Sequence, residues 1–274
     1  MRIPLFHVDA FASKPFAGNP AAVCPLDCWL DDTTLRKVAA ENNLSETAFF
    51  VSQHGRDGGD HSGHYDLRWF TPRGEVKLCG HATLASAYVL LSLLEPELGT
   101  VHFETRHSGT LTVRKERENF ETFSMDFPAM FAKTCANPPN TLLRALGAPS
   151  PSSVLEVNET YIAVYDHESA IRTSRPDFAL MEQLYPFVAA ISAPGETADF
   201  VSRYFKPSYG MPEDPVTGSV HCALAPYWAG RLGKSRLQAR QLSERGGELW
   251  CEVVRDRVML KGHAVLTLWG SLTI

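Results

Sequence analysis

Four short segments of the sequence are dense in residues that move protons or bind anions. They are FAGNPAAV (16–23), NLSETAFF (43–50), CGHAT (79–83) and PEDPVTGSV (212–220). Carboxylates and imidazoles act as general acids and bases, and a glycine that opens a helix leaves backbone N–H groups free for an anion. The segments therefore predict proton-transfer chemistry on a small carboxylated molecule.

Glu46 is the first candidate for an acid–base residue. It stands just before the apolar run Ala48 to Val51, at the mouth of a predicted strand. Poor solvation disfavours the charged form of a carboxyl group, which lets it exchange protons near neutral pH. A plain surface carboxylate or cap at the strand start is the alternative, and the residues alone leave both open.

His81 and Asp214 are the other titratable candidates. His81 follows a glycine at a predicted helix start, where the positive end of the helix dipole favours a neutral imidazole that donates one hydrogen bond and accepts another. Asp214 stands shortly before a second predicted helix start. A structural histidine and a turn or N-cap aspartate are the alternatives for these two residues.

The two helix starts belong to segments that resemble each other. Phe70-Thr-Pro precedes Gly80-His81, and Phe205-Lys-Pro precedes Gly218-Ser219. Each segment is predicted to be a strand, a short loop and a glycine that opens an apolar helix. The echo predicts an internal duplication, with two half-domains that face each other.

Backbone N–H groups at these helix starts are the predicted carboxylate site. The candidates are Gly80, Gly218 and Ser219, because the first N–H groups of a helix have no intrahelical acceptor. The hydroxyl of Ser45 could add a further donor. Asn19 is predicted either to orient a loop across the pocket or to serve as a plain turn residue.

In their order along the chain, these motifs resemble the PhzF-like family, the isomerases of phenazine biosynthesis and their relatives. DAFASKPFAGNPAAV, NLSET, F-T-P…CGHAT and EDPVTGS carry the likeness. The resemblance implies a diaminopimelate epimerase-like fold, no cofactor, a homodimer and a carboxylated, cyclic or amino-bearing substrate. The family prototype isomerises trans-2,3-dihydro-3-hydroxyanthranilate. By the same resemblance, Glu46 carries a proton between two substrate carbons, and His81 and Asp214 assist.

Cys79 and Thr217 bear on the alternatives within that superfamily. Its racemases and epimerases resemble one another in using two cysteines, each directly before the glycine of its helix. Here Cys79 fills the first position but Thr217 fills the second, and a hydroxyl is too weak an acid to replace a thiol. An amino-acid racemase or epimerase that uses Cys79 stays an alternative, as does a non-catalytic small-molecule-binding or regulatory protein. Cys79 is interpreted as a packed apolar residue or a secondary reactive thiol.

Composition argues against other classes of protein. The chain of 274 residues has 26 Lys and Arg against 31 Asp and Glu without a basic block, which disfavours nucleic-acid binding. The longest nearly apolar stretch, 82–94, is too short to span a bilayer. The six scattered cysteines and the absence of a signal-peptide pattern indicate a soluble, reduced, cytoplasmic protein. His61 and His64 with Cys79-x-His81 match no zinc spacing, so no metal is expected.

Many short predicted strands, few helices and no dinucleotide fingerprint indicate an α+β fold. We expect two pseudo-symmetric halves, each a curved, mostly antiparallel sheet wrapped around a central apolar helix. The predicted first half-domain is 1–128 plus 264–274, and the second is 129–263, with a Pro-rich boundary near 128–139. Residues 264–274 carry little charge and would be costly as a free edge, so they are predicted to return and pair with the first half's sheet.

Overall fold

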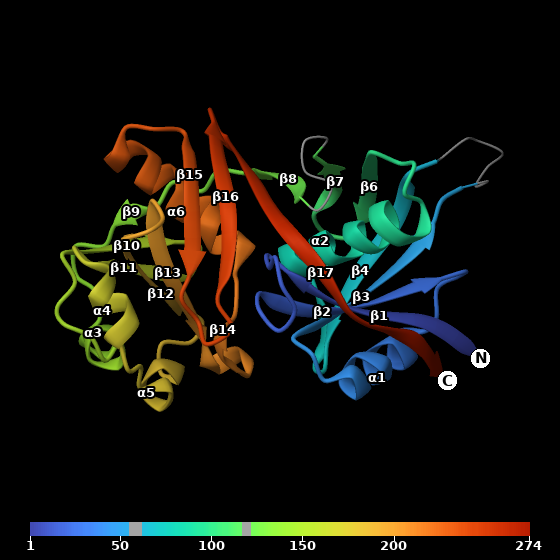
Figure 1. Cartoon of the computed structure of the whole chain (residues 1–274). Coiled ribbons are helices and arrows are strands. Elements are labelled where there is room, and N and C mark those ends of the chain that lie inside the picture. Colours follow the sequence, from blue (N-terminus) through green and yellow to red (C-terminus); the bar gives the residue numbers. More distant parts are fainter. Residues whose placement is uncertain (55–61, 117–121) are drawn as a thin grey trace. The chain divides into compact units, whose positions relative to one another are not determined.

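The computed structural model describes residues 1–54, 62–116 and 122–274. His61 lies outside these residues. The described chain divides into two compact units (Figure 1): unit 1 is Met1–Asp126 with Lys261–Ile274, and unit 2 is Phe127–Leu260. Strands dominate and helices are few, which confirms the predicted α+β class. No helix in the described part of the chain has the length and apolarity to cross a membrane.

Unit 1 contains most of the first half of the chain and the C-terminal strand. Its elements are β1 (Arg2–Ala10), β2 (Asn19–Leu26), α1 (Asp32–Asn42), β3 (Glu46–Ser52), β4 (His64–Thr71), β5 (Gly74–Val76), α2 (Gly80–Tyr88), its π-helical continuation η2 (Val89–Leu94), β6 (Thr100–Thr105), β7 (Gly109–Lys115), β8 (Thr122–Pro128) and the C-terminal part of β17 (Arg257–Thr273).

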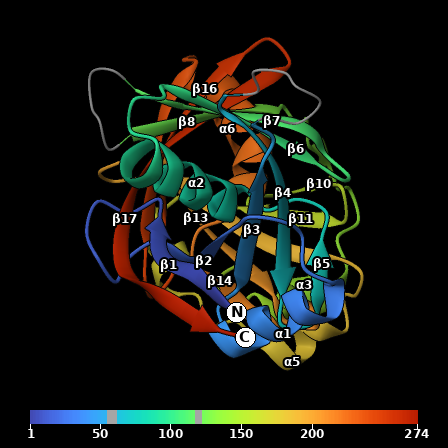
Figure 2. The ribbon, with the colours of Figure 1, turned by 90° about the vertical axis from the view of Figure 1, so that its right-hand side faces the viewer.

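The strands of unit 1 form a closed sheet around α2. β1 pairs with β2 and β17; β3, β4, β6, β7 and β8 follow from β2, and β8 pairs with β17 again. Residues 81–87 of α2 are all buried inside this ring (Figure 2). Thr83 and Ser86 donate their hydroxyls to the carbonyls of Cys79 and Ala82, so no polar group of theirs faces the apolar sheet unpaired.

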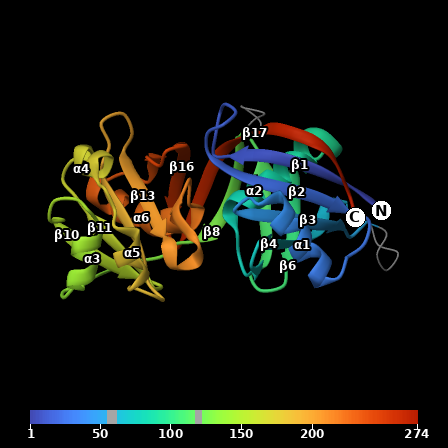
Figure 3. The same cartoon turned by 90° about the horizontal axis from the view of Figure 1, so that it is seen from below.

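The C-terminal strand returns to unit 1, as predicted. β17 pairs antiparallel with β1 from Arg2↔Thr273 to Ala10↔Ala264, with one irregularity between His7 and Val8. Figure 3 shows β17 lying along β1, with both chain ends at the same end of the pair. The pairing removes the free edge that β1 would otherwise expose.

Unit 2 contains the remaining elements. They are β9 (Lys133–Thr134), α3 (Asn140–Ala145), β10 (Ser153–Val157), β11 (Thr160–Val164), α4 (Glu168–Thr173), α5 (Phe178–Glu182), β12 (Val188–Pro194), β13 (Phe200–Lys206), the 3-10 turn η3 (Pro207–Tyr209), β14 (Met211–Asp214), α6 (Gly218–Leu232), β15 (Arg236–Gln241), β16 (Gly247–Val254) and the first residues of β17.

The two units share one scheme of strand pairing. β2–β3 and β11–β12 are parallel, β3–β4 and β12–β13 antiparallel, β4–β6 and β13–β15 parallel, and β6–β7 and β15–β16 antiparallel. In both units the apolar helix lies in sequence between a short strand (β5 or β14) and the next long one. The shared scheme confirms the internal duplication that the sequence echo predicts.

Deletion of residues 264–274 is expected to destabilise the whole protein rather than fray one end. β1 would lose a nine-residue ladder beside side chains such as Ile3 and Val8, which are at most 4% exposed. We expect the melting temperature to fall by more than about 10 °C, since each kcal/mol corresponds to roughly 2–4 °C in a protein of this size. Circular dichroism melts would measure the change.

Trp269→Thr is the matched control for this deletion. The indole of Trp269 is 76% exposed, so its removal should leave the pairing intact and change stability by at most about 0.5 kcal/mol. An unchanged melting temperature after the deletion would contradict the structural role of the returning strand.

Candidate active site

Glu46, the acid–base candidate, is the first residue of β3. Glu46 is 7% exposed and pairs with Ala21 in the parallel register of β2 and β3. Among the described residues, its Oε2 atom has no hydrogen-bond partner. A buried carboxylate oxygen without a donor is costly. Such an atom is suited to accept a proton or a donor from a ligand.

His81 links Glu46 to two other polar residues of unit 1. Its Nε2 lies 3.4 Å from Oε2 of Glu46 and 3.3 Å from Oγ of Ser45. Its Nδ1 lies 3.5 Å from Sγ of Cys79. The imidazole is 6% exposed, in the first turn of α2. A proton can therefore pass between Glu46 and His81 without a large side-chain movement.

Asn19 and Ser45 connect the start of β2 to the same cluster. The Ser45 hydroxyl lies 3.4 Å from Oδ1 of Asn19 and 3.3 Å from the Pro20 carbonyl. Asn19 is fully buried at the first position of β2. The preceding Gly18 has φ +67°, and a Cβ there would lie 2.2 Å from the Ala10 carbonyl oxygen. Only glycine fits this approach, which brings the Asn19 side chain beside Ser45.

The starts of α2 and α6 are built alike. Cys79 and Thr217 are the N-cap residues, both with extended backbone, and neither side chain makes a capping hydrogen bond. The following N–H groups, from Gly80 in unit 1 and from Gly218 and Ser219 in unit 2, lack intrahelical acceptors. Each helix start therefore has N–H groups of the kind that can bind an anion, and their use by a substrate carboxylate stays a prediction.

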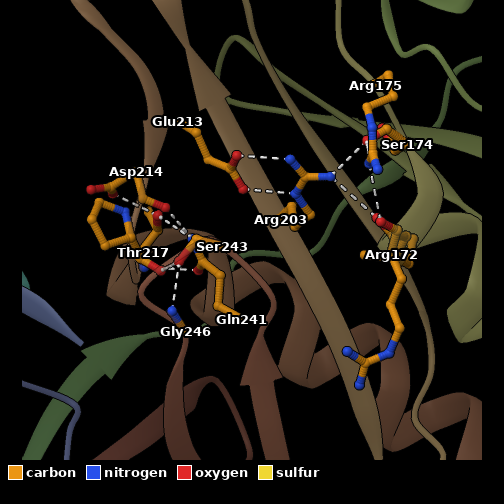
Figure 4. Close-up of polar contacts among 12 residues, drawn as sticks. Arg172, Ser174, Arg175, Arg203, Glu213, Asp214, Thr217, Gln241, Ser243 and Gly246 are labelled. Carbon is orange, nitrogen blue, oxygen red and sulfur yellow. Dashed lines mark hydrogen bonds and ion pairs between the residues drawn. The ribbon is translucent and has the colours of Figure 1, made fainter. Parts of the chain in front are cut away.

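In unit 2, Asp214 lies at the end of β14 and is 4% exposed. Thr217 Oγ1 donates a hydrogen bond to its Oδ2 over 2.6 Å (Figure 4). Lys206 Nζ lies 3.9 Å from the same oxygen. The Thr217 hydroxyl thus orients the Asp214 carboxylate. The N-cap of α6 is Thr217 and not Asp214.

Gln241, which the sequence analysis missed, fixes this turn. Its Nε2 donates to the Asp214 carbonyl over 2.7 Å and to Thr217 Oγ1 over 3.3 Å, and its Oε1 accepts from Thr217 N over 2.9 Å. Figure 4 shows Gln241 against the turn, with Ser243 donating to the Pro215 carbonyl. The signal was present: in the alternating strand RLQARQ, Gln241 takes an inward position otherwise held by Leu237 and Ala239.

An arginine–glutamate pair holds the strand before each helix start, and neither pair was predicted. Arg203 binds Glu213 through two hydrogen bonds of 2.7 and 2.8 Å and also donates to the Ser174 carbonyl (Figure 4). In unit 1, Arg68 makes the same paired contacts with Glu75. The hydrogen bond from Arg68 holds the pKa of Glu75 below its ordinary value. Extending the echo two residues upstream of Phe70 and Phe205 would have revealed both arginines.

His221 of α6 is a structural residue in this frame. Its Nδ1 lies 2.7 Å from the Thr217 carbonyl oxygen, to which it donates. Burial lowers the pKa of His221 to about 4, so the imidazole is neutral at pH 7. A neutral, fully buried imidazole serves the N-cap of α6 rather than proton transfer.

One group of described residues has the composition of a metal site. Ligand atoms of Glu46, Cys79 and His81 all lie within 4.8 Å of one another. His64, the histidine of the sequence pair His61 and His64 that lies in the described part of the chain, does not belong to this group: it stacks on His102, with ring centroids 4.7 Å apart. Proton transfer by Glu46 itself requires no metal.

Comparison with known proteins places these motifs in context. A family model described as phenazine biosynthesis-like protein, PhzC-PhzF, matches residues 8–270. An uncharacterized isomerase of Pseudomonas aeruginosa is 51% identical over 272 residues, 99% of each chain. A second from that organism is 45% identical over the full length of both chains. These names support an isomerase activity.

Solved structures agree with the observed fold. A crystal structure of a PhzF-family phenazine biosynthesis protein from Enterococcus faecalis superposes with a TM-score of 0.91 at 39% identity, covering 100% of both chains. A probable proline racemase from Agrobacterium radiobacter superposes with a TM-score of 0.63 at 11% identity, covering 99% of this chain and 93% of that one. The second likeness concerns the fold alone and confirms the predicted racemase-like and epimerase-like architecture.

Gln241→Met is expected to loosen the turn that carries Asp214. The change keeps the volume but leaves the Asp214 carbonyl and the Thr217 N–H buried without Gln241, at about 1–3 kcal/mol for each group. Urea unfolding should show a loss of roughly 2–5 kcal/mol. Gln238→Met is the control, because Gln238 stands on the same strand and is half-buried. Equal effects of the two changes would contradict the role of Gln241.

Proposed function

The chain belongs to the phenazine biosynthesis-like (PhzC-PhzF) family, and on this premise we propose that it is a cofactor-independent isomerase that moves a proton on a small carboxylated substrate. One observation carries the proposal. Glu46 is a buried carboxylate with an unpartnered oxygen, and an imidazole nitrogen lies 3.4 Å from that oxygen. This is the arrangement that a general acid–base residue requires.

In the proposed reaction, Glu46 removes a proton from a carbon next to a π-system. The C–H bond breaks, its electron pair moves into the π-system, and the proton resides on the carboxyl group. Glu46 then returns the proton to a second carbon of the same molecule, so the double bond moves and no electrons or atoms are gained. His81 holds the substrate and assists the proton, and Asp214 does similar work from unit 2.

The proposed substrate carries a carboxylate and is cyclic or amino-bearing. Helix-start N–H groups favour a carboxylate, and the candidate donors are those of Gly80, Gly218 and Ser219, with the Ser45 hydroxyl. Asn19 supports this set by its contact with Ser45. Substrates of the trans-2,3-dihydro-3-hydroxyanthranilate type belong to this class.

A racemase that uses Cys79 is the second candidate. The 3.5 Å separation of Cys79 Sγ and His81 Nδ1 favours a reactive thiol. Thr217 weakens this candidate, because its hydroxyl donates to Asp214 and cannot substitute for a second thiol. A binding protein without turnover is the third candidate, and it predicts stabilisation by ligands with neither deuterium incorporation nor product formation.

Glu46→Gln is expected to lower turnover by roughly 10²–10⁴-fold, because the amide keeps the shape but cannot take up the proton. Carboxylated ring compounds and amino acids would first be screened by thermal shift, and hits would be incubated in D₂O. Mass spectrometry and NMR would then follow deuterium incorporation and product formation.

Glu41→Gln is the control, because Glu41 is an exposed carboxylate of α1 in the same unit. It should retain wild-type turnover. Unchanged turnover in Glu46→Gln would overturn the assignment of the base, whereas binding with neither deuterium incorporation nor product formation in the wild type would favour the non-catalytic candidate.

We also propose that the protein is a homodimer, as the family resemblance implies, and that it is cytoplasmic, as its scattered cysteines indicate. Light scattering at micromolar concentration is expected to give twice the chain mass of 30.3 kDa. A monomeric mass under these conditions would contradict the dimer.

A further inference from the structure

The cluster at the start of α2 contains a thiol that the proposed reaction does not use. Cys79 is 7% exposed, and its Sγ lies 3.5 Å from Nδ1 of His81. Glu46 adds a carboxylate whose Oε2 has no hydrogen-bond partner in the described chain. Three different ligand types therefore meet in one buried place, and one of them has an unsatisfied oxygen.

The spacing of these atoms is close to that of a tetrahedral metal centre. Bonds of about 2.0–2.3 Å to nitrogen, oxygen and sulfur place tetrahedral ligand atoms roughly 3.3–3.8 Å apart. Cys79 Sγ lies 3.5 Å from Nδ1 of His81, and Glu46 Oε2 lies 3.4 Å from Nε2 of the same ring. A metal binds one imidazole nitrogen, so the ligand beside the other nitrogen must move closer, from within the 4.8 Å that spans the three ligand atoms.

The donor set selects the kind of ion. A thiolate, an imidazole and a carboxylate suit zinc and similar borderline-soft ions, whereas magnesium and calcium prefer oxygen ligands alone. Cys79 is the N-cap of α2, and the positive end of a helix stabilises a thiolate, the form that binds a metal. Three protein ligands and an open fourth position complete such a site.

We propose that a zinc-type divalent cation binds reversibly to Cys79, His81 and Glu46 and thereby occupies the acid–base carboxylate. Binding of the ion is independent of the proposed function, and only its inhibitory consequence rests on it. A bound cation holds the Glu46 carboxylate as a ligand, so the carboxylate cannot accept a proton. The concentration of the free ion thus determines the fraction of chains in which Glu46 can act as a base.

Cobalt(II) titration of the full, EDTA-treated chain tests the site, because a cobalt–thiolate bond gives a charge-transfer absorption. We expect one equivalent of Co²⁺ to produce this band and Zn²⁺ to abolish it by displacement. Cys79→Ser should remove the band and weaken binding by more than the roughly 10–100-fold that an outer-shell partner costs. Glu46→Gln should weaken binding without removing the band, and melting curves would establish that both variants are folded.

Cys28→Ser is the matched control, because Cys28 is an exposed free cysteine elsewhere in unit 1. It should retain the band and the affinity. Absence of the band in the wild type, its persistence in Cys79→Ser, or its loss in Cys28→Ser would overturn the proposal.

Activity measurements separate this inference from the proposed function. The Glu46→Gln comparison is made with EDTA present, so it reports only on the base. If turnover is found, Zn²⁺ should suppress it and EDTA should restore it in the wild type. Suppression that is equally strong in Cys79→Ser would place the inhibitory ion elsewhere and contradict the proposal, while leaving the role of Glu46 intact.

Discussion

Helix α2 exposes no face to solvent along residues 81–87, which are all buried. An apolar helix of this kind is stable only if other elements surround it. Unit 1 meets the requirement by closing its sheet around the helix, and closure requires a strand between β1 and β8, which β17 provides. Enclosure of the apolar helix α2 therefore depends on a strand that lies about 180 residues later in the chain.

The same constraint places the candidate active site. The first turn of an enclosed helix must open at one end of the sheet, and β2 and β3 are parallel, so their first residues lie at one end as well. Asn19 and Glu46 begin these two strands, and His81 lies in the first turn of α2. The contacts of Ser45 and Glu46 with His81 thus arise from topology together with three well-placed residues.

Both units contain an equivalent arginine–glutamate pair, but they differ at the position of the candidate base, Glu46. Arg68–Glu75 and Arg203–Glu213 hold equivalent strands in the two units. Thr47 pairs with Phe70 and Ala189 pairs with Phe205, so the position of Glu46 corresponds to that of Val188. Unit 2 therefore has no acid–base carboxylate at the start of its strand, and its carboxylate, Asp214, comes from the end of β14 instead.

Local patterns predicted more of the molecule than long-range contacts did. The echo around Phe70 and Phe205, the apolar helices and the uncharged C-terminal strand were visible because each signal is contained within about 15 residues. β2 was not predicted, because Asn19-Pro20 is typical of a turn and its β-structure depends on two neighbouring strands. Gln241 joins residues 24 or more positions earlier, a contact that one sequence does not contain.

The asymmetry between the two units also constrains the stereochemistry of the proposed reaction. In a two-thiol racemase, one group removes the proton and the other delivers a proton to the opposite face. Thr217 has a hydroxyl that already donates to Asp214, and a hydroxyl is too weak an acid to play the second part. If Glu46 both removes and returns the proton, the transfer stays on the face of the substrate that Glu46 contacts. A carboxylate shielded from water, at 7% exposure, also exchanges its proton slowly with solvent compared with an exposed one. The buried position of Glu46 thus favours return of the original proton, which is the outcome expected if the proposed reaction moves a double bond within one molecule.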